Sequence, residues 1–158
     1  MTTALEIEKI SPDDTLEVCA RQVIVSYFQK MMSYKEGAEA GTDIEFVHDM
    51  RVTSRRLRAA MDNFEDCFPE KPFKKYYKKI KAITRTMGAV RDLDVLIARF
   101  QRELVTLTEA ERADIRGLIE HLQQEREDAR KPMLTLFAKL EATGFETKFL
   151  EFFVGADF

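Results

Sequence analysis

The sequence of 158 residues has few of the residues that interrupt helices or cross-link chains. It contains six glycines, four prolines and two cysteines. Cys19 and Cys67 stand at no spacing typical of a zinc site, and we expect reduced thiols. No run of about 18 apolar residues occurs, which excludes a membrane-spanning helix. The first ten residues lack a basic segment followed by an apolar one, which excludes a secretory signal and favours a cytoplasmic protein.

Motifs for catalysis and for metal binding are also absent. His48 and His121 are 73 positions apart, and neither HExxH nor CxxC occurs. The phosphate-binding loop GxxxxGK[ST] is missing as well. On a helix, Asp92 and Asp94 lie about 200° apart and do not converge on a metal, while Asp49 points about 100° away from His48. We therefore expect a protein that is not an enzyme, with no catalytic residues, no metal and no cofactor.

The residues that are present indicate helices. Apolar side chains recur at intervals of three and four along almost the whole chain. No segment alternates as a strand does, and no Asn-Gly or Asp-Gly turn occurs. We predict an all-α protein, an antiparallel four-helix bundle with a short C-terminal helix over 144–154.

Start and stop signals divide this pattern into four long helices. The first begins after SPDD, where Ser11 or Asp13 caps it, and ends in a linker at 35–41. The second extends from a capping box of Thr42 and Glu45 to about residue 68. The third covers about 72–104. The fourth begins at a capping box of Thr108 and Glu111 and is broken or kinked near Pro132.

Positive charge is concentrated in one part of the chain. Residues 48–91 hold 12 Lys/Arg and 5 Asp/Glu, a net charge of +7. The remainder holds 13 Lys/Arg and 23 Asp/Glu, a net charge of −10. Because a local positive field attracts anions, this block is the first candidate for a binding site.

The basic residues of this block form two stripes. On the second helix, four of them fall within an arc of about 80° that is about 15 Å long: His48, Arg51, Arg55 and Arg58. Arg56 flanks this stripe. On the third helix, four more fall within an arc of about 60°: Lys74, Lys78, Lys81 and Arg85. If the two helices are neighbours, the stripes merge into one track.

Such a track is most easily explained by an anionic ligand. Like charges four residues apart on a helix repel each other, and solvated faces usually mix their signs. Arginine matches phosphate oxygens in a bidentate way. A linear polyphosphate or a nucleic-acid backbone suits the length of the track better than one small anion does. The aromatic residues Phe46, Phe64 and Tyr76 fall on packing faces, which disfavours nucleic-acid binding by base stacking. Nonspecific binding to the phosphate backbone of nucleic acid remains an alternative, and so does a protein bundle that docks an acidic partner.

Two segments resemble a known family. VHDMRVTSRRLRAAMDNF, which begins at Val47, and MGAVRDLDVLIARF, which begins at Met87, resemble the CHAD domain, the conserved-histidine α-helical domain. The resemblance implies an all-helical fold that binds inorganic polyphosphate through basic residues lining a central pore. Family members are often joined to a triphosphate-tunnel domain or found with polyphosphate granules in bacteria. A location at such granules in the cytoplasm is the corresponding expectation.

Matched by position, the resemblance places His48, Arg51, Arg55 and Arg58 at the ligand and adds Arg91 from the second motif. Asp92 and Asp94 are expected to orient arginines or to support packing. The family usually contains two such bundles in tandem, and we interpret residues 1–158 as a single bundle, half of that arrangement. A second copy of the chain, or a missing second repeat, would complete the pore. His121 lacks the arginine spacing, and we expect it at the surface.

Overall fold

The computed structural model describes residues 11–155, and most of this part of the chain is helical. No strand occurs within that range, which confirms the all-α prediction. The α-helices are α1 (Leu16–Ser33), α2 (Lys35–Ala40), α3 (Ile44–Phe64), α4 (Glu70–Glu103), α5 (Glu109–Ala142) and α6 (Phe145–Val154). Two short 3₁₀ turns, η1 (Glu65–Cys67) and η2 (Leu104–Thr106), follow α3 and α4. No helix in the described range is both long and apolar enough to cross a bilayer.

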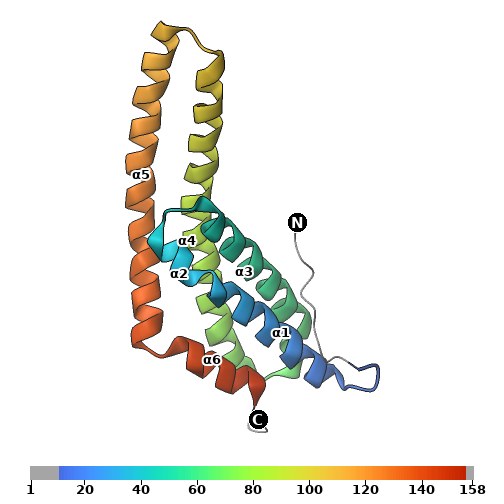
Figure 1. Cartoon of the computed structure of the whole chain (residues 1–158). Coiled ribbons are helices and arrows are strands. Elements are labelled where there is room, and N and C mark those ends of the chain that lie inside the picture. Colours follow the sequence, from blue (N-terminus) through green and yellow to red (C-terminus); the bar gives the residue numbers. More distant parts are fainter. Residues whose placement is uncertain (1–10, 156–158) are drawn as a thin grey trace.

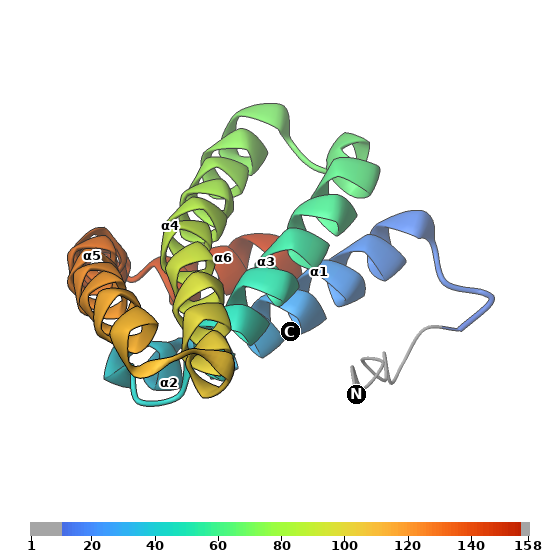
Figure 2. The same cartoon turned by 90° about the horizontal axis from the view of Figure 1, so that it is seen from above.

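The four long helices form one layer in the order α1, α3, α4, α5 (Figures 1 and 2). Helix α3 packs between α1 and α4, and α5 packs on the other side of α4. Helices joined directly by a 3₁₀ turn are antiparallel neighbours, as is usual for short connections. Helix α2 lies on α3, and α6 contacts both α1 and α5. Two shorter helices thus complete the predicted bundle.

Helix α6 closes one face of the layer with aromatic side chains. Phe149 stacks on Phe28 of α1 with ring centroids 3.8 Å apart, and Phe153 contacts Phe68 and Phe73. Tyr76 of α4 joins the same cluster. Each buried phenyl ring contributes roughly 1.5–3 kcal/mol relative to an exposed one. The face of α4 that carries Tyr76 is therefore the core side, and the opposite face is free of α6.

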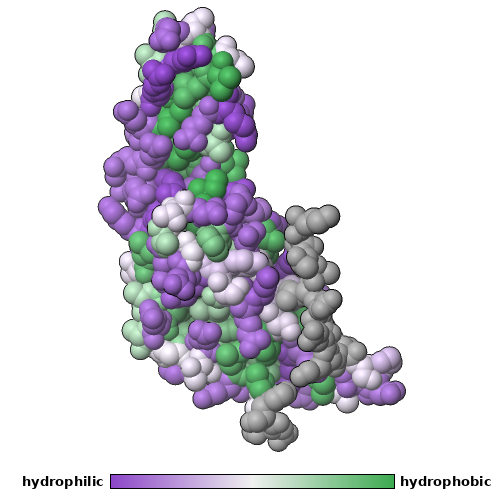
Figure 3. Space-filling view, viewed as in Figure 1, coloured by the Kyte–Doolittle hydropathy of each residue, from purple (hydrophilic) through white to green (hydrophobic). Residues whose placement is uncertain are grey.

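The α4–α5 pair projects beyond the bundle as an arm (Figure 1). Each of the two helices has 34 residues and is about 50 Å long. A separate apolar cluster holds the arm together, with Ile97, Ile119 and Leu122 buried at its centre. Apolar surface is visible along the arm (Figure 3). The bundle, and not the arm, contains the main core.

Two predictions for residues 35–45 are wrong. The expected linker contains α2, whose C-cap Gly41 adopts φ +70°, a left-handed conformation that suits glycine. The expected capping box does not form, because Asp43 caps α3 by accepting a hydrogen bond from the Glu45 N–H. Residue 42 lies one position too early to cap a helix that begins at 44.

Other boundaries differ by a few residues. Thr15, and not Ser11 or Asp13, caps α1 by accepting from the Val18 N–H. Helix α3 ends at residue 64 because the chain tightens into η1 before Pro69. The capping box of Thr108 and Glu111 is confirmed. Helix α5 is not interrupted at Pro132, since buried side chains on both sides of it hold the helix against the bundle.

Candidate anion-binding surface

Helices α3 and α4 contact each other in a defined antiparallel register. The hydroxyls of Ser54 and Thr84 form a buried hydrogen bond of 2.9 Å across the contact. Arg51 lies beside Gly88, and the Arg58 guanidinium lies over the Tyr77 ring. Residue numbers rise along α3 as they fall along α4, so the basic stripes run alongside each other.

The basic stripes also face the same side of the helix pair. The four basic residues of α3 are rotated by about 40–120° around the helix axis from Ser54. The four basic residues of α4 are rotated by about 60–120° from Thr84, and the direction of rotation is the same on both helices. In an antiparallel pair, equal senses of rotation from the contact line lead to the same face. We call these residues the basic face: His48, Arg51, Arg55, Arg58, Lys74, Lys78, Lys81 and Arg85.

Two further predicted residues lie elsewhere. Arg91 is half-buried close to the α3–α4 contact line, at the level of His48. Arg56 is exposed on the far side of α3, about 160° from that line. The structure thus brings Arg91 near the end of the basic face and leaves Arg56 outside it.

Few ion pairs form on the basic face. Of the ten predicted residues, only Lys74 has an ion-pair partner within the described chain, and that partner is Glu70. The Glu70 carboxylate raises the pKa of Lys74, while the Lys74 ammonium holds the pKa of Glu70 below its ordinary value. Both side chains are exposed, so this pair contributes little to stability. No other residue of the face forms an ion pair within the described chain.

Three nitrogen atoms on the α3 side of this face are buried without a hydrogen-bond partner among the described residues. They are His48 Nδ1, Arg51 Nε and Arg58 Nε. An unsatisfied buried polar group costs about 1–3 kcal/mol, so native proteins rarely leave several together. All three atoms belong to the α3 half of the basic face. The basic residues of α3 therefore differ from those of an ordinary solvated helix.

Acidic side chains mark one end of the face. Ligand atoms of Glu45, His48 and Asp49 all lie within 4.8 Å of one another. The prediction that Asp49 points away from His48 is therefore wrong. The positive end of the helix dipole favours carboxylates in the first turns of α3. Three ligands on an exposed helix are fewer than Ca²⁺ or Mg²⁺ takes, and we assign no metal to them.

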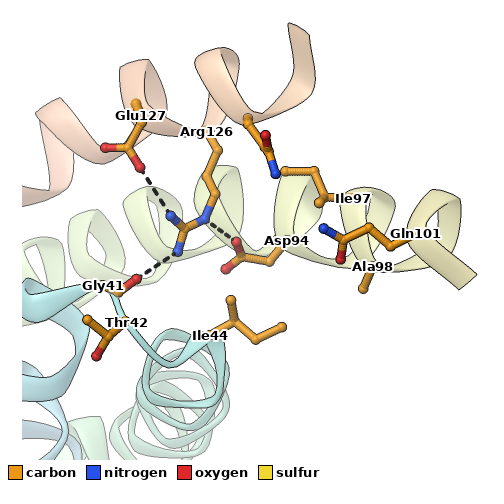
Figure 4. Close-up of a pocket in the computed structure, with 10 residues that line it drawn as sticks. Gly41, Thr42, Ile44, Asp94, Ile97, Ala98, Gln101, Arg126 and Glu127 are labelled. Carbon is orange, nitrogen blue, oxygen red and sulfur yellow. Dashed lines mark hydrogen bonds and ion pairs between the residues drawn. The ribbon is translucent and has the colours of Figure 1, made fainter. Parts of the chain in front are cut away.

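The second motif supplies a structural ion pair in addition to Arg91. Asp94 is 3% exposed and accepts a hydrogen bond from Arg126 Nε of α5. Arg126 also donates to the Gly41 carbonyl oxygen at 3.5 Å and to Glu127 (Figure 4). These groups line a pocket of about 390 Å³ between α4, α5 and the turn before α3. Asp94 therefore orients an arginine as predicted, and this arginine ties α5 to the start of α3.

The sequence analysis did not identify Arg126 or its neighbour Arg130. Arg130 is buried and donates to the carbonyl oxygens of Ala38 and Glu39, at 3.1 and 2.8 Å, which caps the end of α2. Two arginines four residues apart in the acidic segment EREDAR were the available signal. His121, by contrast, is exposed and pairs with Glu125, as predicted.

Comparisons with known proteins find related sequences. Two relatives, uncharacterized proteins from Mycobacterium tuberculosis strains CDC 1551 and H37Rv, are each 34% identical over 61 residues. The matched segment covers 39% of this chain and 12% of the length of each relative. No solved structure gives a significant match.

A family model gives the most extensive match. It is described as the CHAD domain, a family associated with the binding of phosphate polymers, and it matches residues 22–157. The match includes both motifs, the whole basic face and the helices that position it. The chain therefore belongs to the CHAD domain family.

Proposed function

We propose that this chain binds linear inorganic polyphosphate on the basic face of α3 and α4, without hydrolysing it. The observation that carries the proposal is the set of unpartnered buried nitrogens of His48, Arg51 and Arg58, on a face where only Lys74 has an ion-pair partner in the described chain. The buried Nε atoms restrict the two arginine side chains, and in this proposal the anion binds the terminal guanidinium nitrogens, where a charged acceptor relieves the repulsion between neighbouring arginines.

The dimensions of the face favour a chain of phosphates over a single one. From Lys74 to Arg91, α4 alone extends about 25 Å, and the basic residues of α3 lie beside about 15 Å of that length. A linear polyanion contacts many of these groups at once and releases their counterions. Orthophosphate contacts only one or two.

The aromatic residues near the face support phosphate contacts without base stacking. Phe64 and Tyr76 pack in the main cluster. Phe46 is 37% exposed, yet its ring lies against Gly37 of α2. Proteins that bind single-stranded nucleic acid by base stacking place such aromatic rings among their basic residues. On this proposal nucleic acid binds only through its backbone, and therefore less well.

A competition experiment tests the proposal. Long-chain polyphosphate, RNA and DNA at matched total charge compete for the protein over a series of salt concentrations. We expect polyphosphate to compete best, with affinity that falls steeply as salt rises, and no orthophosphate release on prolonged incubation. Arg55→Ala weakens binding, whereas Arg116→Ala, an exposed arginine of the arm, serves as the charge-matched control. Equal competition by all three polymers would identify a nonspecific phosphate-binding surface, and no binding would leave docking of an acidic protein.

The proposal extends to the place of action. On this account the protein works in the cytoplasm, at polyphosphate granules, with a second copy or a second helical repeat facing the basic face. A fluorescent fusion that stays away from granules in cells rich in polyphosphate would contradict this part. The oligomeric state measured with and without polyphosphate tests whether a second copy joins.

A further inference from the structure

Two arginines of α3 rest on α4 instead of extending into solvent. Arg51 packs against Gly88: a Cβ atom built on that glycine would lie 3.5 Å from Arg51 Nε, the only atom of another helix within 4 Å in the described chain. Seven residues further along α3, the Arg58 guanidinium carbon lies 5.7 Å from the centre of the Tyr77 ring. Both arginines are half-buried, whereas Arg55 between them is exposed.

These contacts restrict the conformations of both side chains. A free arginine has many rotamers, and ordering it when a ligand binds reduces the affinity. Arg51 and Arg58 have Nε already buried, so their positions are restricted before any ligand arrives. The contact with an aromatic face also holds Arg58 by cation–π attraction.

Glycine is an unfavourable residue in the interior of a helix such as α4, where alanine is preferred. No positive φ requires it at position 88, since the glycines with positive φ in the described chain are Gly41, Gly144 and Gly155. The close approach of Arg51 is the feature at this position that a larger side chain would disturb.

We propose that Gly88 and Tyr77 are positioning residues, which hold the Arg51 and Arg58 guanidinium groups against α4 in the orientation that binds phosphate. Neither residue touches the ligand in this proposal. Each acts through its arginine, and the inference rests on the proposed function of the basic face.

Valine at position 88 tests the first contact. Its two methyl groups extend beyond Cβ and displace Arg51, so Gly88→Val weakens the binding of long-chain polyphosphate by about two- to tenfold, the effect of releasing one ordered side chain. Gly88→Ala binds as wild type, because 3.5 Å is an ordinary contact distance for Cβ. Gly117→Val is the matched control, since this helical glycine of α5 has nothing within 4 Å in the described chain.

Substitutions of Tyr77 test the second contact. Tyr77→Leu removes the aromatic face and weakens binding by a similar factor, while Tyr77→Phe keeps the ring and restores wild-type affinity. Thermal unfolding of each variant confirms that the fold is retained. Should Tyr77→Leu fail to fold, the Gly88 series decides the inference alone.

Arg51→Ala separates failure of this inference from failure of the proposed function. We expect Gly88→Val to cause no further loss in the Arg51→Ala background, because its effect passes through Arg51. If Arg51→Ala weakens binding but Gly88→Val in the wild-type background does not, or if Gly88→Val adds its full loss to Arg51→Ala, the positioning role is wrong. If Arg51→Ala binds as wild type, the proposed function of this face is wrong.

Discussion

The two stripes of the basic face carry charge of the same sign but have different surroundings. On α3, His48, Arg51 and Arg58 are half-buried, and each has a buried nitrogen without a partner in the described chain. On α4, all four basic residues are exposed, and the first of them pairs with a carboxylate of its own helix. On the proposed function, the two stripes therefore contribute differently. The arginines that rest on α4 provide specific hydrogen bonds to the ligand, and the exposed lysines provide long-range attraction.

The largest expected effect comes from removing the ordered arginines. Arg51→Ala with Arg58→Ala weakens polyphosphate binding about 100-fold, because each loses charge-assisted hydrogen bonds of about 1.5–3 kcal/mol. Lys78→Ala with Lys81→Ala removes the same charge and weakens binding about fivefold. Isothermal titration of both variants measures the two losses. Equal losses would mean that the stripes are equivalent and that only charge matters.

A smaller effect is expected when the positive charge is kept and the planar guanidinium group is replaced by an ammonium group. Arg51→Lys with Arg58→Lys reduces affinity about tenfold, since an ammonium binds phosphate as a point charge without bidentate geometry. Lys78→Arg with Lys81→Arg, the converse exchange on α4, leaves affinity nearly unchanged. Titration with the same polyphosphate compares the two. Wild-type affinity in the lysine variant would show that the α3 arginines act only through their charge.

The salt dependence of polyphosphate affinity should also distinguish the two stripes. Each lost phosphate contact lowers the slope of log affinity against log salt by about one, so Lys78→Ala with Lys81→Ala lowers it by about two. Arg51→Lys with Arg58→Lys preserves the slope while lowering affinity. Fluorescence anisotropy over a salt series gives both slopes. An unchanged slope in the double alanine variant would place the α4 lysines outside the ligand contact.

The smallest effect is expected from the ion pair of the basic face, between Glu70 and Lys74. Glu70→Gln releases Lys74 and strengthens polyphosphate binding by less than about twofold, as expected for an exposed pair. The pairing lowers the pKa of Glu70 from its ordinary 4.5, so its contribution to stability is present above pH 4.5 and is lost as the pH falls through the lowered value. Thermal unfolding from pH 6 downward compares wild type with Glu70→Gln. Weaker binding by the variant would contradict the view that Glu70 restrains Lys74.

Most of the fold could be predicted from local patterns. The long helices follow from the three-and-four spacing, and the capping box of Thr108 and Glu111 defines the start of α5. Helix α2 could not be predicted in this way. It has six residues, and its end is capped by Arg130, about 90 positions later in the sequence. Secondary structure that depends on such a distant contact leaves no periodic signal.

The candidate site was predictable to the same extent. Helical spacing alone groups His48, Arg51, Arg55 and Arg58 on one ridge. The contacts of Gly88 with Arg51 and of Asp94 with Arg126 depend on the register between helices. The charge pattern of one helix contains no information about that register. For this reason the stripes and a role for Asp94 in orienting an arginine were expected, whereas its partner Arg126 and the contacts of Gly88 and Tyr77 with the α3 arginines were not.

The most direct test of the account is an NMR titration of the isotopically labelled protein with long-chain polyphosphate. The side-chain Nε–H signals of Arg51 and Arg58 report on the buried nitrogens themselves, and the backbone signals report on every helix. We predict that these two signals and the amides of the basic face shift together, while those of the outer part of the arm, residues 93–122, stay in place. Shifts confined to the arm or to α5, with Arg51 and Arg58 unchanged, would contradict the account.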